Sequence, residues 1–573
     1  MKVATLLPAT QWLAEYRREN LVNDGLAAVI VTMMLIPQSL AYALLAGLPA
    51  EMGLYASILP LVAYALFGSS RTLSVGPVAV ASLMTASAIG SVTAEGLVDY
   101  ATAATVLALL GGVMLLTLGL FRFGFVANFL SHPVVSGFIT ASGIIIALGQ
   151  LGPLMGLSLQ GDTLPDLLGG LFTLRAEAHR LTVIIGLGGI LFLLFARYRL
   201  AGALVAVGVP ERVASLIVRA APVLVMLVTI PLSALQDYAA LGVPVVGHIP
   251  TGLPAFSTVN LTRELVIELA VPAFLIALIG FVESVSVGRT LGAKRRQRID
   301  ANQELIGLGA ANTVAALSGG FPVTGGFSRS VVNFDAGADT QMASILTALG
   351  ITLAALFLTP ALFFLPKAVL AATIIVAVLG LIDVKTLRQA HRFSLADFSA
   401  VCATILVTLL AGVELGVLTG VVVSIGLHLH QTSNPHFAVV GQVPESQHYR
   451  NIKRHAVITH PHILSIRVDE SLYFANAAYL EEIIFEEARL KPQLAHVVLM
   501  CPAVNTIDLS ALDALESINA RLTEQQVTLH LSEVKGPVMD ALQRSDFLNH
   551  LTGQIFLSQY AADHQLCSVD LYK

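Results

Sequence analysis

Apolar segments of roughly 15 to 24 residues recur along the chain as far as about His430, and very short connections join them. A segment of that length matches the hydrocarbon thickness of a bilayer, and its lack of a polar face does not suit a soluble fold. The composition agrees, since 55% of the residues are hydrophobic, 12% are charged and the mean hydropathy is +0.79. The chain is therefore predicted to be a polytopic membrane protein.

About fourteen apolar segments precede the more polar C-terminal zone. They lie near residues 24–47, 53–68, 73–93, 101–121, 126–149, 181–198, 218–235, 264–289, 303–319, 326–337, 341–364, 368–383, 396–411 and 413–430. Several are shorter than a full crossing, which indicates helices interrupted within the membrane. The first is too long for a cleavable signal, and the aromatic and basic residues before it predict a short interfacial helix over residues 9–20.

These segments divide the chain into three expected parts. Residues 1–23 form an N-terminal segment, residues 24–430 a transmembrane domain, and residues 431–573 a linker with a cytoplasmic domain. Basic residues set the orientation, because cytoplasmic loops carry an excess of Lys and Arg. The basic loops at 289–298 and 385–392 are therefore expected in the cytoplasm. Counting spans from them places both termini in the cytoplasm of a multi-pass protein of the cell inner membrane.

Fourteen spans divide into two sets of seven, and many transporters are inverted repeats with a binding site between the repeats. The third span opens with the Gly76-Pro77 pair, and the corresponding tenth span opens with the glycine-rich stretch 319–330, which contains Arg329. A half-helix beginning near Phe327 would direct its positive dipole end towards the place where Arg329 lies. These features predict an anion site at membrane depth, and the alternative is packing, because Gly and Pro are common in membrane helices.

Polar residues in the first and eighth spans add to this candidate site. Gln38 and Tyr42 lie one helical turn apart, and each is either a substrate contact or an interhelical packing residue. Ser328 supplies a further donor, and backbone amides would bind the anion directly. Glu283 either stays protonated, pairs with Arg329 or titrates during a cycle. In the last case Glu283 is a proton-coupling residue.

Five motifs in order resemble those of the sulfate permease (SulP) family of anion transporters. They are Pro37-Gln38-Ser39-Leu40-Ala41-Tyr42-Ala43, Gly53-Leu54-Tyr55, Gly76-Pro77-Val78-Ala79-Val80, Asn302-Gln303-Glu304-Leu305 and Ser328-Arg329-Ser330. The resemblance implies seven-plus-seven inverted repeats, with a core of spans one to four and eight to eleven and a gate of the other six. It also implies a homodimer in which the core moves against the gate like an elevator.

The family's substrate positions carry over to eight residues of this sequence, which are Gln38, Tyr42, Val78, Ala79, Glu283, Phe327, Ser328 and Arg329. Sodium-coupled bicarbonate members have an Asp where Glu283 stands and a hydroxyl residue one turn later. This chain has Val287 there, which argues against sodium coupling.

The C-terminal zone alternates between strand and helix patterns. Strands are predicted over 462–468, 495–504 and 527–534, and helices over 478–490 and 510–525. The stretch 505–510 resembles the loop of STAS domains, in some of which the residue matching Ser510 is phosphorylated. The ordinary alternative is that Asp508 or Ser510 caps the following helix.

The sequence predicts a secondary active transporter of small anions, with sulfate as the expected substrate and protons as the expected coupling ion. A C4-dicarboxylate carrier, a bicarbonate carrier and an anion channel remain alternatives. Expected partners are the anion, protons, the lipid bilayer and a second copy of the chain, without nucleic acid. The sequence has no paired nucleophile and base, phosphate loop, disulfide framework or spaced metal ligands, so neither an enzyme nor a cofactor or metal is expected.

Overall fold

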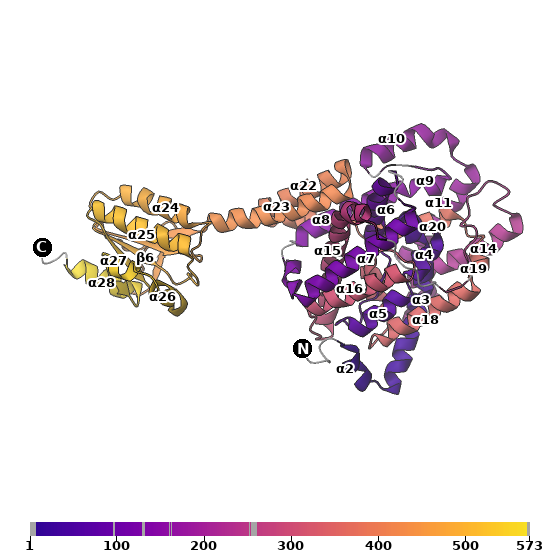
Figure 1. Ribbon diagram of the computed structural model, residues 1–573, viewed down its shortest axis with the longest axis horizontal. Helices are drawn as coiled ribbons and strands as arrows, with labels where there is room; N and C mark the ends of the chain where they lie inside the picture. Colours follow the sequence, from indigo (N-terminus) through magenta and orange to yellow (C-terminus); the bar gives the residue numbers. More distant parts are fainter. Residues whose placement is uncertain are drawn as a thin grey trace. The chain divides into compact units, whose positions relative to one another are not determined.

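The computed structural model describes residues 7–94, 98–128, 132–159, 161, 163–250, 252–253 and 261–569. The chain forms two compact units that divide between Ser424 and Ile425. The first unit is a bundle of helices, and the second contains a mixed sheet with helices (Figure 1). Helix α3 begins at Arg18 and α23 continues to Ser433, so neither expected limit, at residue 23 or at residue 430, coincides with a helix end. The division of the chain at these two limits stays a prediction.

The first half of the bundle runs as far as α14. Its elements are α2 (Ala9–Ala14), α3 (Arg18–Leu45), α4 (Ala50–Tyr55), α5 (Leu59–Phe67), β1 (Val75–Gly76), α6 (Ala79–Ala94), α7 (Tyr100–Leu120), η1 (Phe123–Asn128), α8 (His132–Gly149), α9 (Leu151–Met155), α10 (Leu164–Leu174), η2 (Arg175–Glu177), α11 (Arg180–Phe195), η3 (Ala196–Leu200), α12 (Ala201–Ala206), α13 (Glu211–Arg219) and α14 (Ala221–Gln236).

The second half of the bundle runs from α15 to α23 and is also mainly helical. Its elements are α15 (Arg263–Lys294), α16 (Ala301–Leu317), β2 (Thr324–Gly325), α17 (Phe327–Asp335), α18 (Met342–Phe357), α19 (Thr359–Leu362), α20 (Lys367–Val378), α21 (Val384–Phe393), α22 (Leu395–Ala411) and α23 (Val413–Ser433).

Each of the fourteen predicted segments coincides with one of these helices or helix pairs. In the described residues, seven helices are long and apolar enough to cross a bilayer alone, or eight if the bent pair α13–α14 is one span. The helices α6, α18, α20 and α22 are apolar but shorter, at 10–17 residues. The prediction that some spans are interrupted is confirmed at β1–α6 and β2–α17, where a helix starts only after a short strand.

Two predicted boundaries are wrong. The interfacial helix expected over residues 9–20 ends at Ala14, because Arg17 is extended with φ −121° and caps α3 through a hydrogen bond from its N–H to Oδ1 of Asn20, 2.9 Å away. The fifth span is expected from residue 126, but the chain is a 3-10 helix as far as Asn128, and the α-helix α8 is described from His132. Pro133 is the second residue of α8, and a proline in the first turn favours a helix start at that point.

The helix contacts repeat with the symmetry of an inverted repeat. Helix α3 of the first half packs against α18, and the corresponding helices α15 and α7 pack against each other (Figure 1). The pair α7–α16 has its counterpart in α18–α5, and α6–α15 has its counterpart in α17–α3. These helices form the core, to which both halves contribute equally. A second group, in which α8 packs on α22 and the counterpart α20 packs on α11, forms the gate.

The second unit contains a six-stranded sheet of order β4-β3-β5-β6-β7-β8. Strands β5 to β8 are parallel, whereas β3 is antiparallel to both of its neighbours. Its elements are β3 (Phe437–Gln442), β4 (Tyr449–Asn451), β5 (Ile463–Val468), α24 (Ala477–Arg489), β6 (His496–Met500), α25 (Leu509–Glu524), β7 (Thr528–Ser532), α26 (Gly536–Leu542), α27 (Phe547–His550), β8 (Ile555–Phe556) and α28 (Gln559–Val569). The three predicted strands and two predicted helices are confirmed within a few residues. Strands β3, β4 and β8 and helices α26 to α28 were not predicted.

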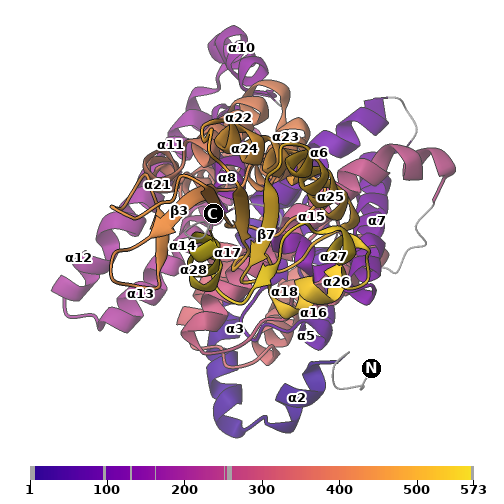
Figure 2. The ribbon, with the colours of Figure 1, turned by 90° about the vertical axis from the view of Figure 1, so that its left-hand side faces the viewer.

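Side chains alternate across this sheet because successive strand residues point to opposite faces. Leu464 and Ile466 of β5 pack with α24 and α25 in one apolar core, while Ile463 packs on the other face with Ala562 and Leu566 of α28. Figure 2 shows the sheet with these helices around it. Both faces are therefore covered, as the apolar run 497–500 of β6 requires.

A pair of histidines lies on the strands β6 and β7. The N–H of Gln554 donates to Nδ1 of His530 at 3.0 Å, so the Nε2–H of His530 donates to Nδ1 of His496 at 3.2 Å. This arrangement requires a neutral His530. Burial, with His496 as a second cause, lowers the pKa of His530 from 6.5 to about 4.

We predict that acid destabilises this unit through His530. The folded state binds fewer protons than the unfolded state, so the stability that depends on His530 is complete above pH 6.5 and is lost as the pH falls towards 4. Urea unfolding of residues 431–573 should show a loss of about 1 kcal/mol between pH 7 and pH 5 that is absent in His530→Gln. The exposed control His564→Gln should keep the loss, and an equal loss in His530→Gln would contradict the assignment.

Candidate functional site

Two short buried strands from the two halves of the bundle cross each other. Strand β1 pairs antiparallel with β2, with Val75 opposite Gly325 and Gly76 opposite Thr324. Helix α6 follows β1 and helix α17 follows β2, so both helices have their N-termini near the crossing. The first amide N–H groups of a helix have no intrahelical acceptor, and its N-terminus carries a partial positive charge. The predicted half-helix start at Phe327 is confirmed.

Hydroxyl groups of the eighth span fix the strand β2 in this position. Ser284 accepts a hydrogen bond from the N–H of Gly325 at 2.9 Å and donates to the carbonyl of Gly280 at 2.6 Å. The hydroxyl of Thr324 also donates to the carbonyl of Gly280, at 2.7 Å. A Cβ at Gly280 would lie 2.8 Å from Oγ1 of Thr324, so this close approach of strand and helix requires glycine.

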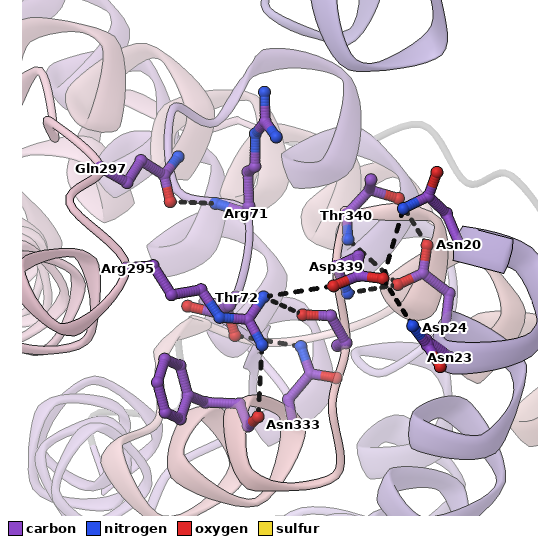
Figure 3. Close-up of polar contacts among 12 residues, drawn as sticks. Asn20, Asn23, Asp24, Arg71, Thr72, Arg295, Gln297, Asn333, Asp339 and Thr340 are labelled. Atoms are coloured by element: carbon purple, nitrogen blue, oxygen red, sulfur yellow. Dashed lines mark hydrogen bonds and ion pairs between the residues drawn. The ribbon is translucent and has the colours of Figure 1, made fainter. Parts of the chain in front are cut away.

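Helix α17 is tied to the segment that leads into β1. The N–H of Ser74 donates to Oγ of Ser330 at 3.0 Å, and Nδ2 of Asn333 donates to the carbonyl of Thr72 at 3.0 Å. Figure 3 shows the second of these contacts beside the network of Asp339. Backbone N–H and C=O groups at membrane depth must form their hydrogen bonds within the protein. These side chains therefore supply hydrogen-bond partners that a continuous helix would have supplied from its own backbone.

Arg329 lies in the first turn of α17 and is 2% exposed. Its Nη1 donates to the carbonyl oxygen of Pro77 at 2.8 Å, which joins the two half-helices directly. Its Nε and Nη2 atoms are buried and donate to no protein atom in the described residues. A buried guanidinium with two unused donors beside two positive helix ends is strongly favourable for a bound anion.

Two glycines allow the guanidinium to occupy this position. A Cβ at Gly76 would lie 3.1 Å from Nη1 of Arg329, and a Cβ at Gly326 would lie 3.0 Å from Nη2. The second Cβ would also lie 3.2 Å from Cγ1 of Val78. A larger residue at either position would require the guanidinium to shift by a few tenths of an ångström. The glycines therefore allow the backbone to approach Arg329 closely, in addition to forming the turn.

The other predicted contacts come from three helices that pack together. Gln38 and Tyr42 are buried on α3, which contacts both α6 and α17, and Val78 and Ala79 are buried at the start of α6. Phe327 is different, since it is 50% exposed, and Ser328 beside it is also exposed. The predicted contacts on α3 and at the start of α6 are therefore buried, whereas the first two residues of α17 are exposed.

Glu283 lies on α15, one residue before Ser284, and interacts electrostatically with Arg329, as does Tyr42. Among the described residues, no ion pair within 4.0 Å joins Glu283 to Arg329. The simple pairing that the sequence allowed is therefore not seen. The Glu283 carboxylate therefore interacts electrostatically with Arg329 without forming a direct ion pair with it.

Sequence reasoning did not predict several residues that hold the site together. Ser284 and Thr324 gave no signal of their own, since a hydroxyl residue in a membrane helix usually bonds to its own backbone. Glu304 belongs to a recognised motif, but its role was not predicted. It is fully buried and accepts hydrogen bonds from the hydroxyl of Tyr64 at 2.7 Å, from Ser69 and from the N–H of Ser70, which fixes the loop before β1.

A further polar network lies where α3 meets the loop between α17 and α18. Asp24 accepts hydrogen bonds from the N–H of Asp339 at 2.7 Å and from the hydroxyl of Thr340 at 2.6 Å (Figure 3). The Asp339 carboxylate is 3.9 Å from Arg295 and also accepts from Asn23 at 2.8 Å. The network holds the first and eleventh spans together at the end of the core.

Ser510 of the second unit is exposed and is the second residue of α25. Asp508 is the N-cap, because its carboxylate accepts from the N–H of Ala511 at 2.9 Å. The same carboxylate accepts from the N–H of Phe474 at 2.8 Å. Asp508 is therefore the cap that the sequence allowed, and the Ser510 hydroxyl is not needed for capping.

The family model described as the sulfate permease family matches residues 21–404, and the STAS domain model matches residues 455–562. The chain therefore belongs to the sulfate permease family of anion transporters. It is 33% identical to sulfate transporter 4.1, chloroplastic, of Arabidopsis thaliana, over 99% of this chain and 83% of that protein. It is also 32% identical to a probable sulfate transporter of Mycobacterium tuberculosis, over 96% of each.

Two solved structures share its fold. Murine solute carrier 26 family member A9, an anion transporter in the inward-facing state, matches with a TM-score of 0.88 at 24% identity, over 99% of this chain and 94% of that one. The transmembrane domain of a cyanobacterium bicarbonate transporter matches with a TM-score of 0.60 at 21% identity, over 72% of this chain and 99% of that one. The fold is thus a membrane unit of seven-plus-seven inverted repeats, with core and gate, followed by a STAS domain. The family consists of transporters and not of enzymes.

We predict that Gly326→Ala weakens anion binding roughly tenfold, because the new methyl group moves the guanidinium of Arg329 away from the crossing. Isothermal titration of the purified protein with sulfate measures the change. Gly90→Ala in α6 is the matched control, since its Cβ would meet no atom within 4 Å. Equal affinities in the two variants would show that the position of the guanidinium does not decide binding.

Proposed function

We propose that this protein is a secondary active transporter that carries sulfate across the membrane in company with protons, with the substrate bound at the β1–β2 crossing. The observation that carries the proposal is Arg329, a buried guanidinium with two unused donors between two helix N-termini. The binding residues are Gln38, Tyr42, Val78, Ala79, Phe327, Ser328 and Arg329.

Sulfate is the proposed substrate because two relatives, matched at 32–33% identity over 83–96% of their length, are named a sulfate transporter and a probable sulfate transporter. A tetrahedral dianion also suits the arrangement, since it can accept from backbone amides of both half-helices and from the guanidinium together. The crossing itself recognises charge and size. The structural likeness to a bicarbonate transporter adds bicarbonate to the substances to compare. C4-dicarboxylates, and chloride for a channel, are compared because the sequence left a C4-dicarboxylate carrier and an anion channel as alternatives.

The substrate is tested by uptake into proteoliposomes. Radiolabelled sulfate, fumarate, bicarbonate and chloride are offered separately to the purified protein, with and without an imposed proton gradient. Concentrative sulfate uptake driven by an inward proton gradient is the expected result. Preferential uptake of another anion would replace sulfate as the substrate, and fluxes that only follow the electrical potential would identify a channel.

Arg329→Ala is predicted to weaken sulfate binding by roughly two orders of magnitude, because the full positive charge of the buried guanidinium at the crossing is lost. Arg329→Lys keeps the charge without the planar fork, so its affinity should lie between the two. Binding is measured by titration on protein that elutes as one species. Wild-type affinity in Arg329→Ala would place the substrate elsewhere.

Glu283 is proposed as the proton-coupling residue. It is half-buried on α15, and it interacts electrostatically with Arg329. A bound anion offsets the positive charge of Arg329 and repels a carboxylate, so anion binding favours protonation of Glu283. The anion and the proton would then travel together and leave together.

Glu283→Gln is predicted to remove the response of sulfate uptake to a proton gradient while sulfate-for-sulfate exchange continues, since glutamine keeps the volume but carries no proton. Glu268→Gln is the control, because Glu268 is an exposed carboxylate on the same helix. Both rates are measured in proteoliposomes. A normal response to the gradient in Glu283→Gln would assign coupling to another group.

The proposed movement is an elevator-like displacement of the core against the gate. Its support is the division of helix contacts into the two groups, with half of the site on each repeat. Contacts between the groups are fewer, and one is the ion pair of Arg219 on α13 with Asp335 at the end of α17, at 3.0 Å. An exposed pair of this kind contributes under about 1 kcal/mol, so it can break in each cycle.

The protein is further proposed to be a homodimer of the inner membrane with both termini in the cytoplasm, as the basic loops indicate. The STAS domain is proposed to regulate or support the transport unit. Within it, Ser510 is the candidate for phosphorylation, because its hydroxyl is exposed and Asp508 already caps the helix. A phosphate there would lie beside the N-terminus of α25.

A further inference from the structure

A large cavity lies at the end of the bundle where α2 meets the core. Its volume is about 1520 Å³, and residues of α2, the loop between α5 and β1, the end of α7 and the loop between α15 and α16 line it. Pockets for small molecules commonly measure roughly 300–1,000 Å³. The cavity is thus much larger than a single inorganic anion needs.

Arginines dominate the charge of this cavity, which six arginines and four carboxylates line. Part of the wall is already paired, since Arg71 lies 3.3 Å from Glu15 and Arg295 lies 3.9 Å from Asp339 (Figure 3). Asp300 accepts hydrogen bonds as the N-cap of α16. The remaining positive charge is therefore concentrated on other arginines.

Arg122, Arg296 and Arg298 belong, with Arg17, to the part of the wall without ion pairs in the described residues. Among the described residues, none of the three makes an ion pair or a side-chain hydrogen bond, and all three are exposed. Arg122 and Arg296 also have left-handed backbone conformations, with φ of 62° and 54°. Such positions favour glycine or asparagine, so they hold arginine at a cost in backbone energy.

An exposed apolar edge adjoins the same arginines. Leu120, the last residue of α7, lines the cavity and is 61% exposed, and Phe121 next to it is 73% exposed. Phe123 follows Arg122 and is also exposed. Aromatic and basic residues together at the end of a membrane helix are typical of the bilayer interface. A ligand here can contact cations with one end and apolar side chains with the other.

We propose that this cavity, lined by Arg122, Arg296 and Arg298 beside Leu120, binds the phosphate headgroup of an anionic membrane lipid. The headgroup lies against the arginines, and the acyl chains lie along the exposed end of α7. Each arginine near an anionic lipid surface contributes favourably to binding. The occupied cavity would join α2 to the loop between α15 and α16. The proposal does not depend on the transported substrate.

Trp12 allows a direct test, because it is the single tryptophan of the chain and lines the cavity. The full-length protein in phosphatidylcholine nanodiscs is titrated with dihexanoyl-phosphatidylglycerol, and Trp12 emission is recorded. Dihexanoyl-phosphatidylcholine controls for the acyl chains, and sodium sulfate controls for a free anion. The titrations are repeated in Arg329→Ala, which removes signals from the crossing.

We expect a saturable change with phosphatidylglycerol alone. The triple variant Arg122→Gln, Arg296→Gln, Arg298→Gln should raise its midpoint by roughly one to two orders of magnitude. The control Arg388→Gln, Arg392→Gln removes exposed arginines that do not line the cavity, and its midpoint should not change. An equal response to phosphatidylcholine or sulfate, or a wild-type midpoint in the triple variant, would overturn the proposal. The side chains substituted in the triple variant and in its control are exposed, and elution as a single species checks that each variant, Arg329→Ala included, is folded.

Discussion

The hydrogen bond from Arg329 to the carbonyl of Pro77 joins the two halves of the membrane unit at the point where a short strand interrupts the helices of each half. A buried guanidinium is tolerated only where its charge is offset, and an interrupted helix is tolerated only where its backbone is satisfied. The crossing of β1 and β2 meets both requirements. The strands pair with each other, the helices that follow them begin nearby, and two donors of Arg329 have no partner among the described residues.

The inverted repeat explains how such a crossing can be built. Each half supplies one strand and one half-helix, and neither half can satisfy its strand alone. The same symmetry governs the surrounding core, where α3–α18 and α15–α7 are equivalent contacts and α5–α16 lies between them. Details within the repeat differ, because Ser284 and Thr324 secure β2 through the eighth span, whereas Glu304 secures the loop before β1. The overall plan is symmetric, and the polar contacts that complete it are not.

Positive charge occurs in two environments in the membrane unit. Arg329 is buried and rigidly placed, which suits a ligand that must be held in one geometry. Arg296 and Arg298 are exposed on a loop, which suits attraction to a negative surface rather than selection of one anion. The difference in burial, more than the residue type, separates the proposed transport site from the proposed lipid contact.

The sequence by itself determined the membrane class, the number of apolar segments and the break before Phe327, because chain length per crossing and helix-breaking residues act locally. It also brought Arg329, Glu283 and Gln38 into one hypothesis through corresponding spans. Only the tertiary structure decided that Glu283 stands apart from Arg329 without a direct ion pair, that Asp508 rather than Ser510 caps α25, and that Ser284 holds β2. These outcomes depend on which side chains meet across hundreds of residues. Distances between packed helices fix them, and no local pattern in the chain encodes those distances.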